Sequence, residues 1–182
     1  MECLLVSQCA PTLAGLKPAS LFRWHTEHKR LLMELSYWNQ RLQAAGVHIR
    51  RLQEQPAFSL IYVYRPAKLQ RCLQDEETSS FLREFGYSGD SLESDLQQLQ
   101  RRLSGGSEFP HEIGIFLGYP LEDVRGFIRN EGRRSQYSGY WKVYGNLSAA
   151  KRQFDAYRVC TDLLCRWYAE GASVVDLTAV ES

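Results

Sequence analysis

The sequence lacks an excess of charge of either sign. Its 182 residues carry 22 lysines and arginines against 21 aspartates and glutamates, so the formal net charge is +1. The basic pairs Arg50-Arg51, Arg101-Arg102 and Arg133-Arg134 are each diluted by nearby acids. A nucleic-acid-binding protein usually carries a basic patch with a clear excess of positive charge. The composition therefore argues against a nucleic-acid partner.

Long apolar runs are also absent. No uninterrupted stretch approaches the roughly 20 apolar residues that a membrane-spanning helix needs. The first residues, MECLLV, show neither the basic region nor the small-residue cleavage site of a secretion signal. The five cysteines are an odd number and cannot all pair within one chain. We therefore expect no membrane association, a reducing cytoplasmic location and no disulfide.

Motifs for metals and nucleotides are missing. The chain contains no C-x-x-C, no H-E-x-x-H, no acidic calcium loop and no glycine-rich phosphate loop. Cys160 and Cys165 lie five residues apart on a predicted helix, about 140° apart around its axis, so they cannot chelate one ion. The sequence predicts no metal site and identifies no cofactor.

What is present is the composition of an ordinary globular protein, with 44% hydrophobic and 24% charged residues. This length suits a single domain, because two domains would each have a marginal core. We expect one domain over residues 1–178, followed by a loose tail at 179–182.

Apolar residues at spacings of three and four predict four helices. One begins near Thr26 and is closed by Gly46; the next follows a capping pair, Asp90 with Glu93, and stops at Gly105-Gly106. The others run from Pro120, with Glu122 and Asp123 in the first turn, to Gly132, and from Ser148 to Gly171. Short helices are expected between Pro66 and Gly86, and prolines 11 and 18 interrupt any long helix in residues 1–24.

Four segments are strand candidates. Residues 58–65 (FSLIYVYR) are β-branched and aromatic on both faces, which is typical of a central strand. Residues 47–52 alternate more weakly, residues 109–118 (FPHEIGIFLG) form a short apolar run that a buried helix would also fit, and residues 139–144 contain YWKVY. We predict an α/β or α+β fold, with a small mixed central sheet of about four strands covered by helices.

Cys9 lies in an unusual segment, CAPTLAGLKP, where small residues surround one thiol and Lys17. A thiol beside a cation has a lowered pKa and becomes a usable nucleophile. Free cysteines are, however, more often small buried residues. Both interpretations are open from the sequence.

His111 and Glu112 are the second unusual pair. His111 is flanked by Pro110 and apolar residues, so a neutral imidazole could act there as a base. In a strand, adjacent side chains point to opposite faces, so both could enter one cleft only at a bulge or a strand end.

These residues lead to two hypotheses. The first is an enzyme or small-ligand protein with Cys9 as nucleophile or redox thiol, His111 as its base and Glu112 as an orienting or acidic group. Its anionic ligand would contact Lys17, Arg65, Lys142 and Tyr144. The second is a non-catalytic module that binds a protein partner through arginine and aromatic surface such as Tyr119, Tyr137 and Tyr140.

Several blocks resemble a known family. CAPTLAGLKPASLF, IYVYR, FPHEIGIFLGYPLEDVRGFI and GYWKVYGN, followed by a helix with Tyr157 and Cys160, are similar to small uncharacterised proteins of anaerobic Gram-positive bacteria. The resemblance runs from about Cys9 to Gly171 and implies a bacterial cytoplasmic protein without implying an activity. Its motif positions in this chain include Cys9, Pro11, Lys17, Arg65, His111, Glu112, Lys142 and Tyr144.

A second likeness, to papain-like peptidases of the cell-wall type, is a remote alternative. Their later histidine begins a strand resembling H-x-G-I-Y-L-G, whereas HEIGIFLG has one residue too many between His111 and Gly114. The Asp-Cys-Ser-Gly signature of that family is absent around Cys9.

Overall fold

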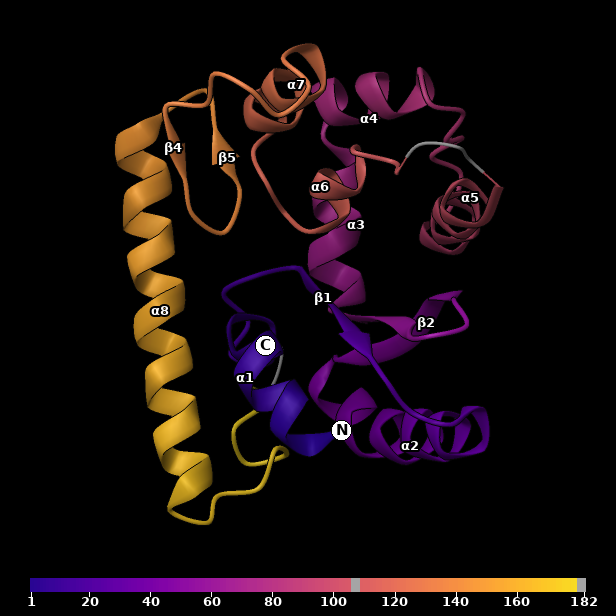
Figure 1. The fold of residues 1–182 in the computed structure, drawn as a ribbon, viewed down its shortest axis with the longest axis vertical. Helices are drawn as coiled ribbons and strands as arrows, with labels where there is room; N and C mark the ends of the chain where they lie inside the picture. Colours follow the sequence, from indigo (N-terminus) through magenta and orange to yellow (C-terminus); the bar gives the residue numbers. More distant parts are fainter. Residues whose placement is uncertain (106–108, 180–182) are drawn as a thin grey trace.

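A three-stranded antiparallel sheet organises the N-terminal half of the protein (Figure 1). The structure is a computed structural model and describes residues 1–105 and 109–179. The elements, in chain order, are α1 (Glu2–Leu13), β1 (Ala19–Trp24), α2 (His28–Leu42), the 3-10 turn η1 (Gln43–Ala45), β2 (His48–Glu54), β3 (Ser59–Tyr64), α3 (Pro66–Gln74), α4 (Glu76–Arg83), α5 (Leu92–Gly105), α6 (Ile113–Phe116), α7 (Leu121–Arg129), β4 (Tyr137–Ser138), β5 (Lys142–Val143) and α8 (Leu147–Ala169).

The prediction of a single mixed α/β domain is confirmed. In the sheet, β3 lies between β1 and β2, and both pairings are antiparallel. All six residues of β3 are buried, which explains its apolar sequence on both faces. The weak strand predicted at 47–52 is also present as β2, with a bulge between Arg51 and Gln53.

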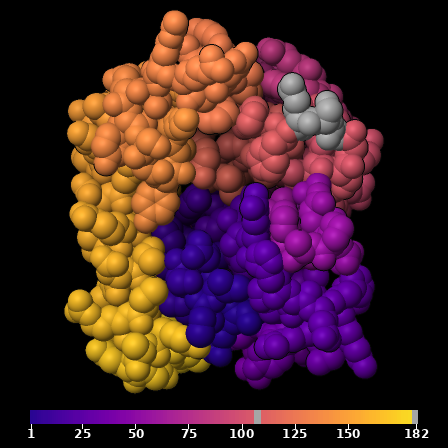
Figure 2. Space-filling model, in the orientation of Figure 1, coloured from indigo at the N-terminus to yellow at the C-terminus, as the bar shows by residue number. Residues whose placement is uncertain are grey.

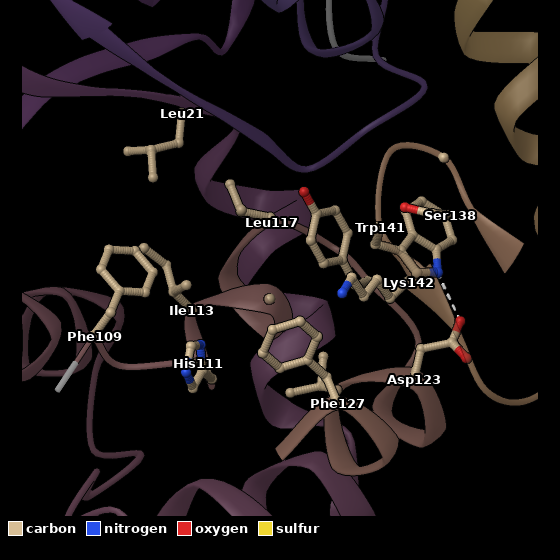
Figure 3. A pocket seen from close by; sticks show the side chains of 14 residues that line it. Leu21, Phe109, His111, Ile113, Leu117, Asp123, Phe127, Ser138, Trp141 and Lys142 are labelled. Atoms are coloured by element: carbon tan, nitrogen blue, oxygen red, sulfur yellow. Dashed lines mark hydrogen bonds between the residues drawn. The ribbon is translucent and has the colours of Figure 1, made fainter. Parts of the chain in front are cut away.

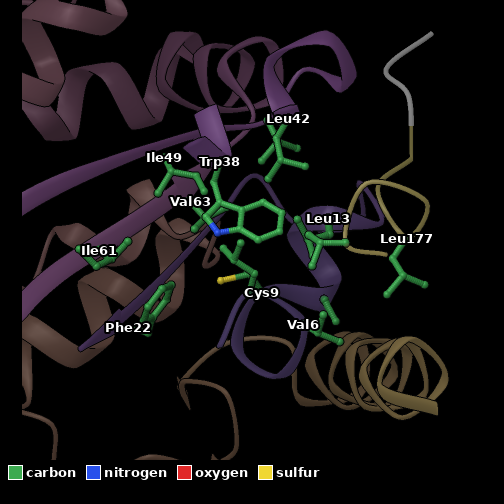
Figure 4. Packing of buried hydrophobic residues seen from close by; sticks show 14 of the residues in the cluster. Val6, Cys9, Leu13, Phe22, Trp38, Leu42, Ile49, Ile61, Val63 and Leu177 are labelled. Atoms are coloured by element: carbon green, nitrogen blue, oxygen red, sulfur yellow. The ribbon is translucent and has the colours of Figure 1, made fainter. Parts of the chain in front are cut away.

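The sheet separates two hydrophobic clusters. Ile61 and Val63 of β3 point to one face, where they pack with α1, α2 and the C-terminal part of α8 (Figure 4). Tyr62 and Tyr64 point to the other face, toward α3, α5 and α6. Because side chains alternate along a strand, the helices on one face of the sheet pack together and are separated by the sheet from those on the other face.

The N-terminal segment differs from its prediction. Residues 2–13 form the helix α1 although it contains Pro11, and residues 19–24 form the edge strand β1. Pro11 lies in the last turn of α1, so its missing N–H removes one hydrogen bond near the end of the helix. The expectation that prolines 11 and 18 interrupt any long helix agrees with the end of α1 at Leu13, but neither this helix nor the strand β1 was predicted.

The prediction of a strand at residues 109–118 is wrong. These residues form a turn and the short helix α6, in which the backbone N–H of Ile113 donates to Pro110 and that of Gly118 to Ile115. A helical turn buries four consecutive residues, 113–116, whereas a strand would turn half of them away. The buried helix that the sequence left open is the conformation found.

The strand predicted at 139–144 is reduced to Lys142 and Val143. This β5 pairs with β4 in a separate two-stranded sheet, so the segment lies outside the central sheet. Trp141 and Val143 are buried and pack with Phe154 of α8, which holds this hairpin against the long helix.

The predicted helices are present, but their caps differ. The helix expected from Thr26 begins at His28, and the one expected from Ser148 begins at Leu147. Asn146 caps α8, because its side chain accepts from the N–H of Ala149 at 3.0 Å. Ser91, rather than the pair Asp90 and Glu93, accepts from the N–H of Ser94 at 3.1 Å at the start of α5.

The end of the described chain returns to α1. The N–H of Ala179 donates to the carbonyl of Leu13 at 3.0 Å, and the carbonyl of Ala179 accepts from Arg65 at 2.7 Å. The remaining residues of the predicted tail, 180–182, lie outside the described residues, as does Gly106 of the predicted helix stop.

Candidate functional site

The structure does not gather Cys9, His111 and Glu112 into one cleft. Cys9 belongs to the cluster on the α1 side of the sheet. Glu112 is buried beside Tyr87 on the other side, and His111 is exposed at the mouth of a pocket. The sheet therefore stands between the predicted nucleophile and its predicted base.

Cys9 is enclosed by apolar side chains, including Leu13, Phe22 and Val63 (Figure 4). Its side chain has no exposed surface. Burial raises the pKa of the thiol to about 12, although the nearby Lys17 charge and the Ser20 side chain lower it in part. At neutral pH the thiol is protonated, so Cys9 has the environment of a core residue.

Glu112 is buried and forms an ion pair with the partly exposed Arg102. Its carboxylate accepts from Nε of Arg102 and, at 3.1 Å, from the hydroxyl of Tyr87. Burial and the adjacent carboxylate raise the pKa of Tyr87. Glu112 thus joins α5 to the turn before α6, and these contacts occupy the carboxylate that the sequence suggested for catalysis.

Arg65 lies at the end of β3 and is only 1% exposed. It follows the strand directly and precedes Pro66, the first residue of α3. Its guanidinium donates at 2.6–2.9 Å to four backbone carbonyls, those of Thr12, Leu13, Ala45 and Ala179. These bonds join the end of β3 to three other segments, namely the end of α1, the turn η1 and the C-terminal residues around Ala179. Arg65 therefore has a structural role, at a position for which the sequence suggested anion binding.

His111 and Lys142 do share a pocket, although 30 residues separate them in the sequence (Figure 3). This aromatic pocket has a volume of about 320 Å³. It lies between α6, α7, the hairpin and β1, where the space-filling view shows a hollow between the indigo and orange parts of the chain (Figure 2). Its walls are largely apolar and include Leu21, Phe109, Tyr119, Phe127 and Trp141.

Two polar side chains of the aromatic pocket, those of His111 and Lys142, lie near the ring of Phe127. The ring of His111 lies 4.8 Å from that of Phe127 and 6.0 Å from that of Phe109, centroid to centroid. The ammonium of Lys142 lies 5.9 Å from the ring centroid of Phe127 and donates to the carbonyl of Gly132. No described carboxylate forms an ion pair with Lys142, so its charge is met by a neutral carbonyl and an aromatic face.

Asp123 shapes the wall of the aromatic pocket. It is 2% exposed, and its carboxylate accepts from Nε1 of Trp141 at 2.6 Å (Figure 3). It also accepts from the backbone N–H groups of Tyr144 and Gly145 at 2.7 and 2.8 Å. The sequence placed Asp123 only in the first turn of a helix; its function in holding the hairpin depends on contacts 18 to 22 residues away.

Tyr144 lies behind this wall and does not line the aromatic pocket. Its hydroxyl donates to the carbonyl of Arg133 at 3.0 Å. Gly126 permits the approach of its ring to α7, because a Cβ on that glycine would lie 2.5 Å from Tyr144 Cβ and Cγ. Tyr144, predicted from the sequence as a ligand contact, thus packs against α7 and lies outside the lining of the aromatic pocket.

Lys17 lines a second, smaller pocket beside β1. Its ammonium lies 5.4 Å from the ring centroid of Tyr119, and that ring in turn stacks on Trp141 at 4.9 Å. The Lys17 side chain is 7% exposed, and burial lowers its pKa to about 8. Tyr119 belongs to the walls of both pockets, which places Lys17 next to the aromatic pocket without opening into it.

Tyr137 and Tyr140, proposed from the sequence as interface residues, are each 43% exposed. Both rings also pack against Phe154. Within the described ranges, no three histidine, cysteine or acidic side chains are grouped so that they could hold a metal ion. In the same part of the chain, no helix is both long and apolar enough to cross a membrane.

Residues 5–178 match the model of a family described as "Protein of unknown function (DUF3793)". Since this match extends over nearly the whole chain, the protein belongs to that family of unknown function. No curated protein and no solved structure matches the chain. The family resemblance expected from the sequence blocks is thereby confirmed at the level of an uncharacterised family.

Proposed function

We propose that the protein binds a flat, apolar small molecule that carries an anionic group. The observation that supports this proposal is the aromatic pocket with Lys142 at its wall. A volume of about 320 Å³ lies at the small end of the range for ligand sites, and an apolar lining with few polar groups is typical of such sites. The proposal places binding, rather than catalysis, at this pocket.

The apolar part of the ligand would lie against the aromatic walls. Phe127 and Trp141 approach from α7 and the hairpin, and Leu21 approaches from β1. Aromatic side chains prefer stacked or edge-on contacts with other rings, so a planar ligand would gain most from them. Phe109 and His111, which are both exposed, would cover its outer side.

The anionic part would pair with Lys142. Its ammonium now has a backbone carbonyl as acceptor, and a carboxylate or sulfonate would offer a stronger, charge-assisted hydrogen bond. Asp123 would not repel such a ligand strongly, because three N–H donors already offset its charge. A reducing cytoplasm is the proposed location, in keeping with five cysteines and no described disulfide.

Two related dyes test both parts of this proposal. Anilinonaphthalene sulfonate is flat and anionic, and N-phenylnaphthylamine is its neutral counterpart. Both should bind the wild type with saturable 1:1 fluorescence titrations. Lys142→Met should weaken only the anionic dye, by about tenfold for one charge-assisted hydrogen bond. Phe127→Ala should weaken both dyes, because it removes wall area.

Lys151→Met is the matched control, because Lys151 also lies over an aromatic ring, that of Tyr137, but outside the aromatic pocket. It should leave both affinities unchanged. Equal effects of Lys142→Met and Lys151→Met would contradict the anionic part of the proposal. Dye binding that is insensitive to Phe127→Ala would place the dyes elsewhere and contradict the pocket itself.

A further inference from the structure

The pocket around Lys17 is built differently from the aromatic pocket. It has a volume of about 210 Å³ and lies beside β1, the edge strand of the sheet. Gln8 of α1, Thr161 of α8 and Tyr140 of the hairpin region contribute polar side chains to it. Three segments that are distant in the sequence, at 117–119, Tyr140 and Thr161, therefore meet residues 7–21, which include Lys17.

Lys17 is a buried cation without an anion. Its ammonium makes no hydrogen bond or ion pair with any residue in 1–105 or 109–179; its neighbours are the ring of Tyr119 and the Cys9 thiol. That thiol is protonated at neutral pH, since burial raises its pKa to about 12. A buried charge is costly unless an opposite charge or hydrogen bonds compensate it, and a cation–π contact compensates only in part.

Further polar groups of the same pocket also have no described partner. The amide of Gln8 and the hydroxyls of Tyr119 and Tyr140 make no hydrogen bond to any described residue, although each can donate one. Ser20 and Thr161 differ, because the first is bonded to Thr12 at 2.8 Å and the second to the carbonyl of Tyr157 at 2.9 Å. The hydroxyl of Ser7 likewise makes no hydrogen bond to any described residue, so the pocket offers one ammonium and four spare donor groups.

We propose that this pocket binds a small monocarboxylate, with the carboxylate on the Lys17 ammonium and the hydroxyl of Tyr140 as a second donor. A single charge is favoured because Lys17 is the one lysine or arginine among the described lining residues. A dianion would leave one of its two negative charges without a cation among the described lining residues. This inference does not depend on the function proposed for the aromatic pocket.

The affinity should depend on pH with a sign set by Lys17. The carboxylate pairs with the ammonium, and burial lowers the pKa of Lys17 to about 8 in the empty pocket. Binding should therefore be constant between about pH 6 and 7, where acetate is ionised and Lys17 is protonated, and weaken as the pH rises through about 8, approaching tenfold per pH unit. A carboxylate on an exposed lysine would keep its affinity to about pH 10.

Acetate is the probe for the experiment. Amide NMR shifts of the full chain are followed at pH 7 during titration with sodium acetate, at an ionic strength held constant with sodium chloride. The wild type should show one saturable set of shifts around residues 8, 17 and 140. Lys17→Met should weaken acetate binding at least about tenfold, whereas Lys151→Met, which removes a charge outside both pockets, should leave it unchanged.

Tyr140→Phe is a second variant, and it should fold like the wild type because it removes only one hydroxyl from a half-exposed ring. It should weaken acetate binding a few-fold without changing its pH dependence. Acetate shifts that persist in Lys17→Met, or that avoid the pocket, would overturn the inference. Tighter binding of inorganic phosphate than of acetate at the same residues would overturn the choice of a monocarboxylate.

Discussion

Arg102 and Glu112 form an ion pair in which the carboxylate is 1% exposed and the guanidinium is 34% exposed. The two partners are therefore not equivalent. Loss of the arginine leaves a buried negative charge, whereas loss of the glutamate charge leaves a cation that can still reach water. This pair links α5 to the turn before α6, and the residues on either side of Glu112, His111 and Ile113, line the aromatic pocket.

Arg102→Ala should therefore destabilise the protein more than Glu112→Gln does. We expect a loss of about 2–4 kcal/mol in the free energy of unfolding for Arg102→Ala, and of about 1–2 kcal/mol for Glu112→Gln, which keeps an acceptor for Tyr87. Urea denaturation at pH 7 measures both. Equal losses, or a larger one for Glu112→Gln, would contradict the asymmetry of the pair.

Arg65 should be essential for stability and irrelevant to ligand binding. Arg65→Lys keeps the charge but replaces a planar group that reaches four carbonyls by a single ammonium. We expect a loss of about 3 kcal/mol or more, because several buried carbonyls lose their donor. Thermal unfolding should show a decrease of roughly 10 °C for a chain of this size.

Arg158→Lys is the control for that substitution, since its guanidinium pairs with Asp155 on the surface and is 68% exposed. It should change the free energy of unfolding by less than about 0.5 kcal/mol. A similarly small effect at Arg65 would show that its backbone contacts contribute little.

The central strand illustrates what the sequence can predict. Residues 59–64 are apolar on both faces, and only a strand buried between two layers needs that pattern. The long helix α8 was equally predictable, because its stripe of Phe154, Tyr157 and Leu164 repeats at helical spacing over many turns. In both elements the local pattern and the tertiary environment agree.

The segment 109–118 illustrates the limit. Its apolar run is too short to distinguish a strand from a helical turn. The choice depends on distant contacts: Tyr62 donates from the sheet to the carbonyl of Phe116 at 2.6 Å, and Gly118 adopts a φ of +75° beside Pro18. These partners lie 54 residues away or more, beyond any local pattern.

The candidate site was predictable in its residues but not in its grouping. His111, Lys17 and Lys142 were recognisable as polar groups in apolar or small-residue surroundings, and all three line pockets. The sequence could not show that the sheet separates Cys9 from His111, because face assignment requires the register of β1 and β3. Lys17 and Lys142 also line different pockets, which the sequence does not show.

Cys9 should be unreactive in the folded protein. Its thiol is fully buried and its pKa is raised to about 12, so almost no thiolate exists at pH 8. A thiol reagent at pH 8 should label the exposed Cys3 first and Cys9 only in denaturant. Mass mapping of the labelled peptides identifies the sites, and all five thiols should titrate in denaturant without a reductant. Early labelling of Cys9 would contradict its burial.

Lys17→Met should stabilise the empty protein, with a pH dependence that identifies the cause. Burial lowers the Lys17 pKa from 10.5 to about 8, so below pH 8 the folded state holds an ammonium in a costly environment. Between about pH 8 and 10.5 the unfolded chain binds more protons at this residue, and the stability of the wild type rises relative to the variant. Above that range the difference disappears.

At pH 7, in a buffer without carboxylates, the variant should therefore be more stable by roughly 3 kcal/mol at most, which corresponds to the full pKa shift. Urea denaturation of both proteins from pH 6 to 10.5 measures the difference, and other titrating groups cancel in it. Saturating acetate at pH 7 should decrease this difference in the free energy of unfolding, because acetate stabilises only the wild type. Lys151→Met should give no such trend, because Lys151 is exposed. A difference that stays constant over this range of pH would mean that Lys17 is not held as a buried cation, and the acetate proposal would lose its physical basis.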